Sequence, residues 1–250
     1  MPISVKDSGV WRTATSVYAR AGGAWRQAKN VWVKVAGVWQ LAYYRFTGTQ
    51  TYTAGQSGQW TVPAGTYTIE VTVIGGGGGA SGSQENDGTP TYGSGGGGSG
   101  GYQVRTVAVT PGQQYAFSVG SGGIGNNTAN GGTGGAGQGS SFGGFQSTGG
   151  GGGRSGSYQT NAAGASGTPS ELLTPAQKGY GSGTQVHGGD GGSNPLGTGG
   201  AGGLNITFQN GGQGTGYGSG GGGAGARQSG GSHPNGRGGD GAGGVVIIKY

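Results

Sequence analysis

Runs of glycine fill the second half of the chain and limit what it can fold into more than any other feature. The first run directly follows an apolar segment, in residues 73–79 (VIGGGGG). Glycine (73 residues) and proline (8) make up about a third of the 250 residues, a proportion typical of low-complexity or disordered chains. Only eight of these glycines lie in residues 1–74. The chain therefore has two parts of different composition, and the glycine-rich part is either a disordered tail or a fold.

Segments with the pattern of β-strands stand on both sides of the glycine runs. Residues 59–74 contain two strand-like stretches around a turn at Pro63–Gly65, and residues 102–120 read as a hairpin that turns at Pro111–Gly112. The chain ends in the apolar VVIIKY (245–250). Because an unpaired apolar strand promotes aggregation, we expect this segment to join the sheet that contains residues 67–74. The sequence thus predicts a β frame (47–74, 102–120 and 245–250) that holds both ends of the glycine region.

The glycine runs can form structure of their own, because a residue without Cβ lets backbones approach closely. Extended helices with three residues per turn pack in this way, with support from weak Cα–H···O contacts. No strict Gly-X-Y repeat is present, which excludes collagen. We therefore predict an all-β fold with essentially no α-helix, in which the glycine runs of residues 75–101 and 121–244 form extended helices with three residues per turn that pack backbone to backbone.

Runs that alternate in direction place the turns between them at two ends. Counting outward from residue 74 predicts that 83–92, 154–178, 193–196 and 227–235 are distal to the frame, whereas 184–187 and 204–210 (LNITFQN, with strand-like alternation) are proximal. Exposed aromatic, aliphatic and arginine side chains on rigid turns suit a binding surface, although ordinary loop residues are the alternative. The predicted binding residues are Tyr92, Tyr158, Leu172, Leu173, Leu196, Arg227 and His233.

A repeat of 14 residues marks the N-terminal part. Trp11, Trp25 and Trp39 have this spacing, and glycine precedes each unit's tryptophan by two positions. Short strands separated by turns predict a β-meander module over residues 1–46. The tryptophans form either the small core of this module or a docking surface, since a pseudo-threefold monomer can cap the end of a homotrimer. Trp11, Trp25, Trp32 and Trp39 are the candidate attachment residues, and the two interpretations stay open.

The positive charge of the protein belongs to this module. Seven basic residues face only Asp7 in the first 45 positions, whereas the remainder is neutral. A basic surface with aromatic residues can bind nucleic acid, but a solvated face is the favoured interpretation, and the single Arg-Gly-Gly (237–239) does not form a repeat. We predict no nucleic-acid partner.

Patterns that carry chemistry are weak. Matches to Gly-x-Gly-x-x-Gly arise by chance at this glycine content and lack the strand–helix context. His187, Asp190 and Ser193 only superficially resemble a catalytic triad, because no nucleophile elbow accompanies them. The tandem repeat of calcium-binding nonapeptides is missing, and the two histidines lie 46 residues apart. We predict no enzyme activity, no cofactor and no metal.

Targeting signals are also weak. The chain has no cysteine, and its first residues lack the pattern of a signal peptide. No apolar run has the length of a membrane helix. We predict synthesis in the cytoplasm without a signal peptide.

Several motifs together resemble one known group of proteins. A strand that ends in Val-Ile followed by five glycines, GGGGSGGYQV, PGQQYAFSVGSGG, GSSFGG and the terminal GGVVIIKY are similar to the glycine-rich receptor-binding adhesins at the tip of the long tail fibres of T-even-like bacteriophages. The resemblance covers most of residues 47–250.

This resemblance implies a location and partners. It implies a polyglycine-II sandwich in the virion, at the tip of the tail fibre, whose distal loops bind a host outer-membrane protein or a surface glycan. It also implies a trimeric tail-fibre protein as the attachment partner, with a single copy of the chain at each tip. The alternatives are a structural connector or assembly protein of a tail or baseplate, and an ice-binding glycine sandwich, against which the long irregular segment QENDGTPTY argues.

Overall fold

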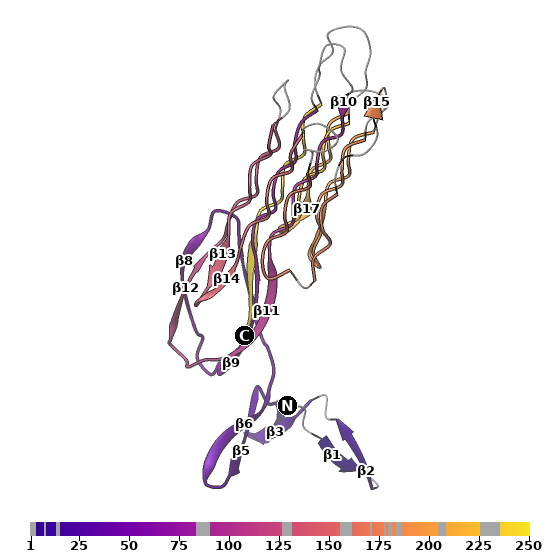
Figure 1. Cartoon of the computed structure of the whole chain (residues 1–250). Helices are drawn as coiled ribbons and strands as arrows, with labels where there is room; N and C mark the ends of the chain where they lie inside the picture. Colours follow the sequence, from indigo (N-terminus) through magenta and orange to yellow (C-terminus); the bar gives the residue numbers. More distant parts are fainter. Residues whose placement is uncertain are drawn as a thin grey trace.

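The computed structural model shows an elongated molecule in which a β frame stands between N-terminal hairpins and a bundle of glycine-rich segments (Figure 1). The described residues form strands, turns and extended segments, and none of them lies in a helix. The predicted all-β class is therefore confirmed. The structure describes residues 4–7, 9–13, 16–83, 91–126, 132–155, 162–170, 172–177, 179, 182–183, 187–204, 209–225 and 236–250.

Two four-stranded antiparallel sheets make the frame. The first has the order β11 (Tyr102–Ala108), β9 (Thr68–Ile74), β18 (Val245–Lys249) and β7 (Thr49–Thr53). The second has the order β14 (Phe145–Ser147), β13 (Ser140–Phe142), β12 (Gln114–Ser118) and β8 (Ser57–Thr61). In the first sheet Val246 pairs with Val73, which confirms that the C-terminal segment returns to the strand preceding the glycine region.

The consecutive strands β11 and β12 belong to different sheets, so the predicted hairpin over 102–120 is wrong. The turn at Pro111–Gly112 exists, but β11 before it pairs with β9, whereas β12 after it pairs with β8 and β13. At this turn the chain passes from one sheet of the frame to the other and does not form a hairpin. Local alternation cannot distinguish the two cases, because each strand has one apolar face in both.

The core of the frame lies between the two sheets. Trp60 and Phe142 pack at a centroid distance of 6.0 Å, and Tyr52 stacks on Phe117. Burial of these rings and of the β-branched side chains around them stabilises the frame. The buried core cluster consists of Trp60, Val62, Ile69, Val71, Val73, Val109, Phe117, Val119, Phe142, Val246 and Ile248.

The N-terminal part consists of three separate hairpins, so the predicted continuous meander is wrong. They are β1 (Ser4–Asp7) with β2 (Val10–Thr13), β3 (Tyr18–Ala21) with β4 (Ala24–Gln27), and β5 (Asn30–Val35) with β6 (Val38–Tyr44). Gly9, Gly23 and Gly37, all with φ between 80° and 84°, lie in the turns that close them. No ladder joins one hairpin to the next within the described residues.

Twelve described glycine-rich segments, here called rods 1 to 12, form the bundle above the frame. Their backbone hydrogen bonds repeat every three residues: in rod 1, the N–H groups of Gly75 and Gly78 donate to one neighbouring rod, those of Gly76 and Gly79 to a second, and that of Gly77 to a third. A period of three is that of an extended helix with three residues per turn. The rods comprise residues 75–83, 93–101, 119–126, 132–139, 148–155, 162–169, 173–177, 187–193, 197–204, 209–214, 218–225 and 236–244.

Three of these rods form the centre of the bundle. Rods 1, 2 and 11 bond to one another, each is bonded to six rods, and all of their described residues are buried. The other nine described rods surround this central triangle, which is the closed shell of a hexagonal packing. The three central rods contain only Gly, Ala and Ser, because almost every direction around them is occupied by another backbone.

Two short ladders lie within the bundle region. β10 (Thr91–Tyr92) pairs with β15 (Ser182–Gly183), and β16 (Gly197–Thr198) pairs with β17 (Thr215–Gly216). Figure 1 shows β10 and β15 at the end of the bundle that points away from the frame. We call this end distal.

Candidate functional site

The hydrogen bonds give the direction of every rod and so define the distal end. Rod 1 leaves β9 and runs outward, rod 2 runs back into β11, and each later rod is antiparallel to the one before it or to a rod of known direction. Odd-numbered rods run outward and even-numbered rods run inward. The distal end is therefore the end at which odd-numbered rods finish (residues 83, 126, 155, 177, 204 and 225) and even-numbered rods begin (93, 132, 162, 187, 209 and 236), and these rod ends form the distal rim.

Three of the predicted binding residues lie at the frame end of the bundle and not at the distal end. Leu172 and Leu173 belong to the connection between rods 6 and 7, which is beside the frame, and the carbonyl of Leu196 accepts a hydrogen bond from Tyr217 in another frame-side connection. The exposed Leu172 lines a pocket of about 270 Å³ together with Tyr102, Gln103, Val104, Arg105 and Pro169. Their distal placement is wrong.

Residues 204–210 are predicted to lie against the frame, but the described residues of this segment lie at the distal end. Leu204 ends an outward rod, and its N–H donates to Oε1 of Gln209, which begins an inward one. Both residues therefore belong to the distal rim. Residues 205–208, on which the strand-like pattern depended, lie outside the described residues.

Of the remaining predicted binding residues, Tyr92 lies on β10 at the distal end, but its side chain is outside the described part of the chain. Tyr158, Arg227 and His233 lie outside the described residues altogether. The exposed Arg154 lies near the end of rod 5 on this rim, where it lines a groove of about 560 Å³ together with Thr133 and with alanine and glycine residues of rods 4, 5 and 6. Sequence reasoning placed Arg154 at the start of a distal segment without singling it out.

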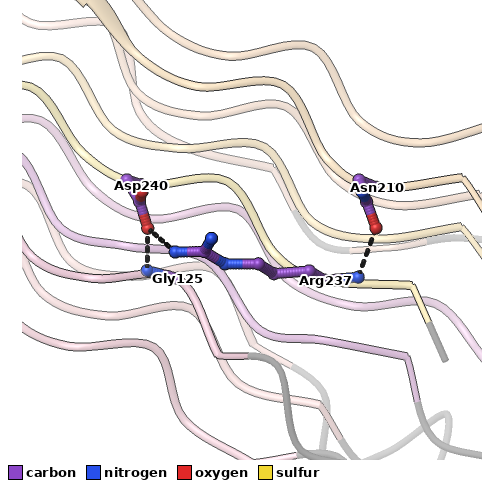
Figure 2. A network of polar contacts seen from close by, with 4 residues as sticks. All are labelled: Gly125, Asn210, Arg237 and Asp240. Atoms are coloured by element: carbon purple, nitrogen blue, oxygen red, sulfur yellow. Dashed lines mark hydrogen bonds and ion pairs between the residues drawn. The ribbon is translucent and has the colours of Figure 1, made fainter.

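Polar side chains on outer rods accept hydrogen bonds from N–H groups that have no backbone acceptor within the described residues. Figure 2 shows Asp240 Oδ1 accepting hydrogen bonds from Gly125 N and from Arg237 Nη2, both at 2.7 Å, while Asn210 Oδ1 accepts from Arg237 N at 2.7 Å. Arg237 and Asp240 are three residues apart and so lie on the same side of a rod with period three. These contacts tie rods 3, 10 and 12 together.

Two of the three residues that superficially resemble a triad, Asp190 and Ser193, have the same structural role. Asp190 Oδ1 accepts from Gly202 N at 2.7 Å, and Ser193 Oγ accepts from Gly199 N at 2.8 Å. His187, Asp190 and Ser193 follow one another at intervals of three along rod 8, which corresponds to about 9 Å per step in an extended helix of this kind. Groups arranged in this way cannot pass a proton directly from one to the next.

The tryptophans of the hairpins lie in two different environments. Trp25 and Trp39 are 70% and 63% exposed, so they do not form a core. Trp32 instead packs edge-on against Tyr67 of the frame, with ring centroids 5.1 Å apart. Beside it, Lys29 Nζ donates to Thr66 Oγ1 and Asn30 Nδ2 donates to the carbonyl of Gly65. Trp32 thus belongs to the joint between the third hairpin and the frame; the side chain of Trp11 lies outside the described residues.

The described part of the chain contains no group of three or more His, Cys, Asp or Glu side chains placed to hold a metal ion. It also contains no helix with the length and apolar character needed to span a membrane.

Comparison with known proteins agrees with the glycine-rich architecture. A search of curated proteins found no match. A family model described as a glycine-rich domain matches residues 50–250, which begin in β7 and include the whole frame and all twelve rods. The chain therefore belongs to the glycine-rich domain family.

Proposed function

We propose that this protein is a non-enzymatic adhesin at the tip of a bacteriophage tail fibre, which binds a receptor on the host cell surface. The observation that carries the proposal is that the two ends of the molecule have different features. Exposed tryptophans lie on hairpins at one end, and six connections gather at the other, with a closed bundle of rods between them. Such a bundle holds many connections at a fixed position far from the attachment end.

We further propose that the rods are polyglycine-II helices. Their hydrogen-bond period of three, the alternation of direction and the restriction of the central rods to Gly, Ala and Ser all favour this conformation. A rigid bundle reduces the conformational entropy that the loops lose on binding, and so favours affinity. The receptor would be an outer-membrane protein or a surface glycan.

Attachment is assigned to the hairpins. Exposed aromatic side chains commonly dominate the energy of protein interfaces, and Trp25 and Trp39 occupy equivalent positions in two of the hairpins. The partner we propose is a trimeric tail-fibre protein, with one copy of this chain on each trimer. The double variant Trp25→Ala/Trp39→Ala is expected to lose fibre binding while the frame stays folded; global unfolding of this variant would contradict the assignment.

Exchange of single connections between two related adhesins of different host range tests receptor binding. Replacement of 226–235, which joins rods 11 and 12 at the distal end, is expected to transfer receptor binding or host range. The matched control replaces 194–196, a connection of the frame side. If all six distal exchanges leave binding unchanged, the protein is a structural connector of the tail, which is the second candidate function.

A further inference from the structure

Each N-terminal hairpin places a basic residue directly opposite its repeated tryptophan. The ladders pair Lys6 with Trp11, Arg20 with Trp25, and Lys34 with Trp39. Residues directly opposite each other in an antiparallel ladder project from the same face, with Cβ atoms about 5 Å apart. The 14-residue repeat therefore repeats a cation together with an indole ring, which the spacing of the tryptophans alone did not indicate.

The third hairpin shows the contact within such a pair. Lys34 Nζ lies 5.9 Å from the centroid of the Trp39 ring, within the range of a cation–π interaction. Both residues are exposed, as are Arg20 and Trp25 in the second hairpin. Charge and aromatic surface are thus presented side by side to the outside.

Arg20 and Lys34 have no acidic partner within the described part of the protein. The side chain of Lys6 lies outside the described residues. The described ion pairs join Arg237 to Asp240 and Lys249 to Glu70, both outside the hairpins. Asp7 is the single acidic residue among the first 45. An exposed cation–π contact by itself contributes little to stability. The three pairs are better explained by an external partner that supplies both apolar surface and negative charge.

We propose that the three cation–tryptophan pairs recognise an acidic protein end with threefold symmetry, each tryptophan entering an apolar pocket while its cation meets a carboxylate at the rim. This inference rests on the proposed attachment to a trimer and specifies its chemistry. A nucleic acid would also attract cations and stack on indole rings, but it would not require one equivalent pair in each of three hairpins. Identical pairs at identical positions match three identical protomers.

The test uses the full-length chain and tail fibres isolated without it. The charge-reversal variant K6E/R20E/K34E keeps every tryptophan, and the matched control K6R/R20K/K34R keeps every charge. Dissociation constants are measured from roughly 0.05 to 0.5 M NaCl, a range over which exposed charges become strongly screened. Thermal unfolding of the frame in each variant controls for folding.

The wild type and the control are expected to lose affinity in parallel as salt rises. Charge reversal is expected to weaken binding at low salt by at least about tenfold and to flatten the salt dependence, because interfacial charges mainly set the association rate and its salt dependence. Equal affinities and slopes for the wild type and the reversal variant would overturn the acidic-rim inference while leaving attachment intact.

Two other outcomes separate the remaining possibilities. Failure of the wild type to bind fibres would remove the attachment proposal, and this inference with it, without affecting receptor binding at the distal end. Displacement of the wild type from fibres by a short single-stranded oligonucleotide, but not by the same concentration of free phosphate, would assign the surface to nucleic acid instead.

Discussion

Gly78 and Gly151 approach so closely that a Cβ atom on Gly78 would lie 2.0 Å from the carbonyl oxygen of Gly151. Gly78 lies in central rod 1, where backbone surrounds it, and Gly151 lies in outer rod 5. Because the obstacle is backbone within a hexagonal packing, it cannot move aside as a flexible side chain could. Glycine is required here by the distance between rods.

We therefore expect Gly78→Ala to destabilise the protein by about 3 kcal/mol or more, as severe overpacking does, or to prevent folding. Gly139→Ala in rod 4 is the matched control, because its Cβ would meet its nearest neighbour, the carbonyl oxygen of Ser147, at 3.2 Å. Denaturant unfolding of both variants checks the difference. A Gly78→Ala protein as stable as the Gly139→Ala protein would contradict the packing of rod 1.

Two buried serines of rod 2 differ in their hydrogen bonding, so replacing each by alanine is expected to have opposite effects on stability. Ser94 Oγ donates to the carbonyl of Gly82 at 2.6 Å, whereas Ser99 Oγ is buried without a hydrogen-bond partner. Ser94→Ala is expected to cost about 1 kcal/mol, and Ser99→Ala to be neutral or stabilising by a similar amount, because an unsatisfied buried polar group carries its desolvation penalty. Thermal unfolding measures both; destabilisation of equal size in the two variants would show that Ser99 is satisfied.

The Asp240 contacts permit a comparison of two substitutions. Asp240→Ala removes the acceptor of Gly125 N and of Arg237 Nη2, and we expect a loss of about 1–2 kcal/mol, since both partners of the ion pair are partly exposed. Asp240→Asn retains an acceptor oxygen and is expected to recover part of this loss. The denaturation midpoints of the wild type and the two variants test this expectation. Identical midpoints for the wild type and Asp240→Ala would mean that water replaces the carboxylate at no cost in stability.

Much of the frame was predictable because its signals are local. The strand pattern over 67–74 and the apolar VVIIKY correctly predicted adjacent strands. The 14-residue tryptophan repeat predicted short strands separated by turns, and such turns are present at Gly22–Gly23 and Gly37. Which sheet each strand joins was not predictable from alternation. The exposure of Trp25 and Trp39 was not predictable either, because large aromatics serve both cores and interfaces.

The rods were counted incorrectly for a physical reason. Rod 6 (AAGASGTP, 162–169) lies at the outside of the bundle, so only the positions that face inward have to be glycine, and these are Gly164 and Gly167, three residues apart. Conversely, the run 211–223 contains a turn at Thr215–Gly218 that glycine content does not reveal. The structure has one outward rod and one inward rod more than the predicted path. Because rods missed in such a pair leave the alternation intact, the predicted path still ended at the frame, although Leu172, Leu173 and Leu196 were assigned to the wrong end.

Hydrogen exchange distinguishes a packed bundle from a disordered glycine tail. The N–H of Gly78 donates to the carbonyl of Gly98 at 2.8 Å in a buried rod, whereas the N–H of Gly152 on outer rod 5 has no acceptor within the described residues. We expect the Gly78 amide to exchange at least about a hundredfold more slowly than that of Gly152, because exchange at Gly78 requires the central rods to separate. Amide exchange followed by NMR measures both. Similar fast rates at the two glycines would contradict the rod packing altogether.

The joint at Trp32 gives a prediction that separates it from the other tryptophans. Trp32→Ala removes the edge-on contact with Tyr67, while the hydrogen bonds of Lys29 and Asn30 to the frame remain. We expect this variant to loosen the third hairpin from the frame at a cost of about 1 kcal/mol for the aromatic contact, which limited proteolysis near residues 45–48 would detect as faster cleavage. Trp25→Ala, matched in residue type but free of any such contact, should leave this cleavage rate unchanged. Equal rates for Trp32→Ala and the wild type would show that the hydrogen bonds alone hold the joint, and faster cleavage in Trp25→Ala would mean that the second hairpin also supports it.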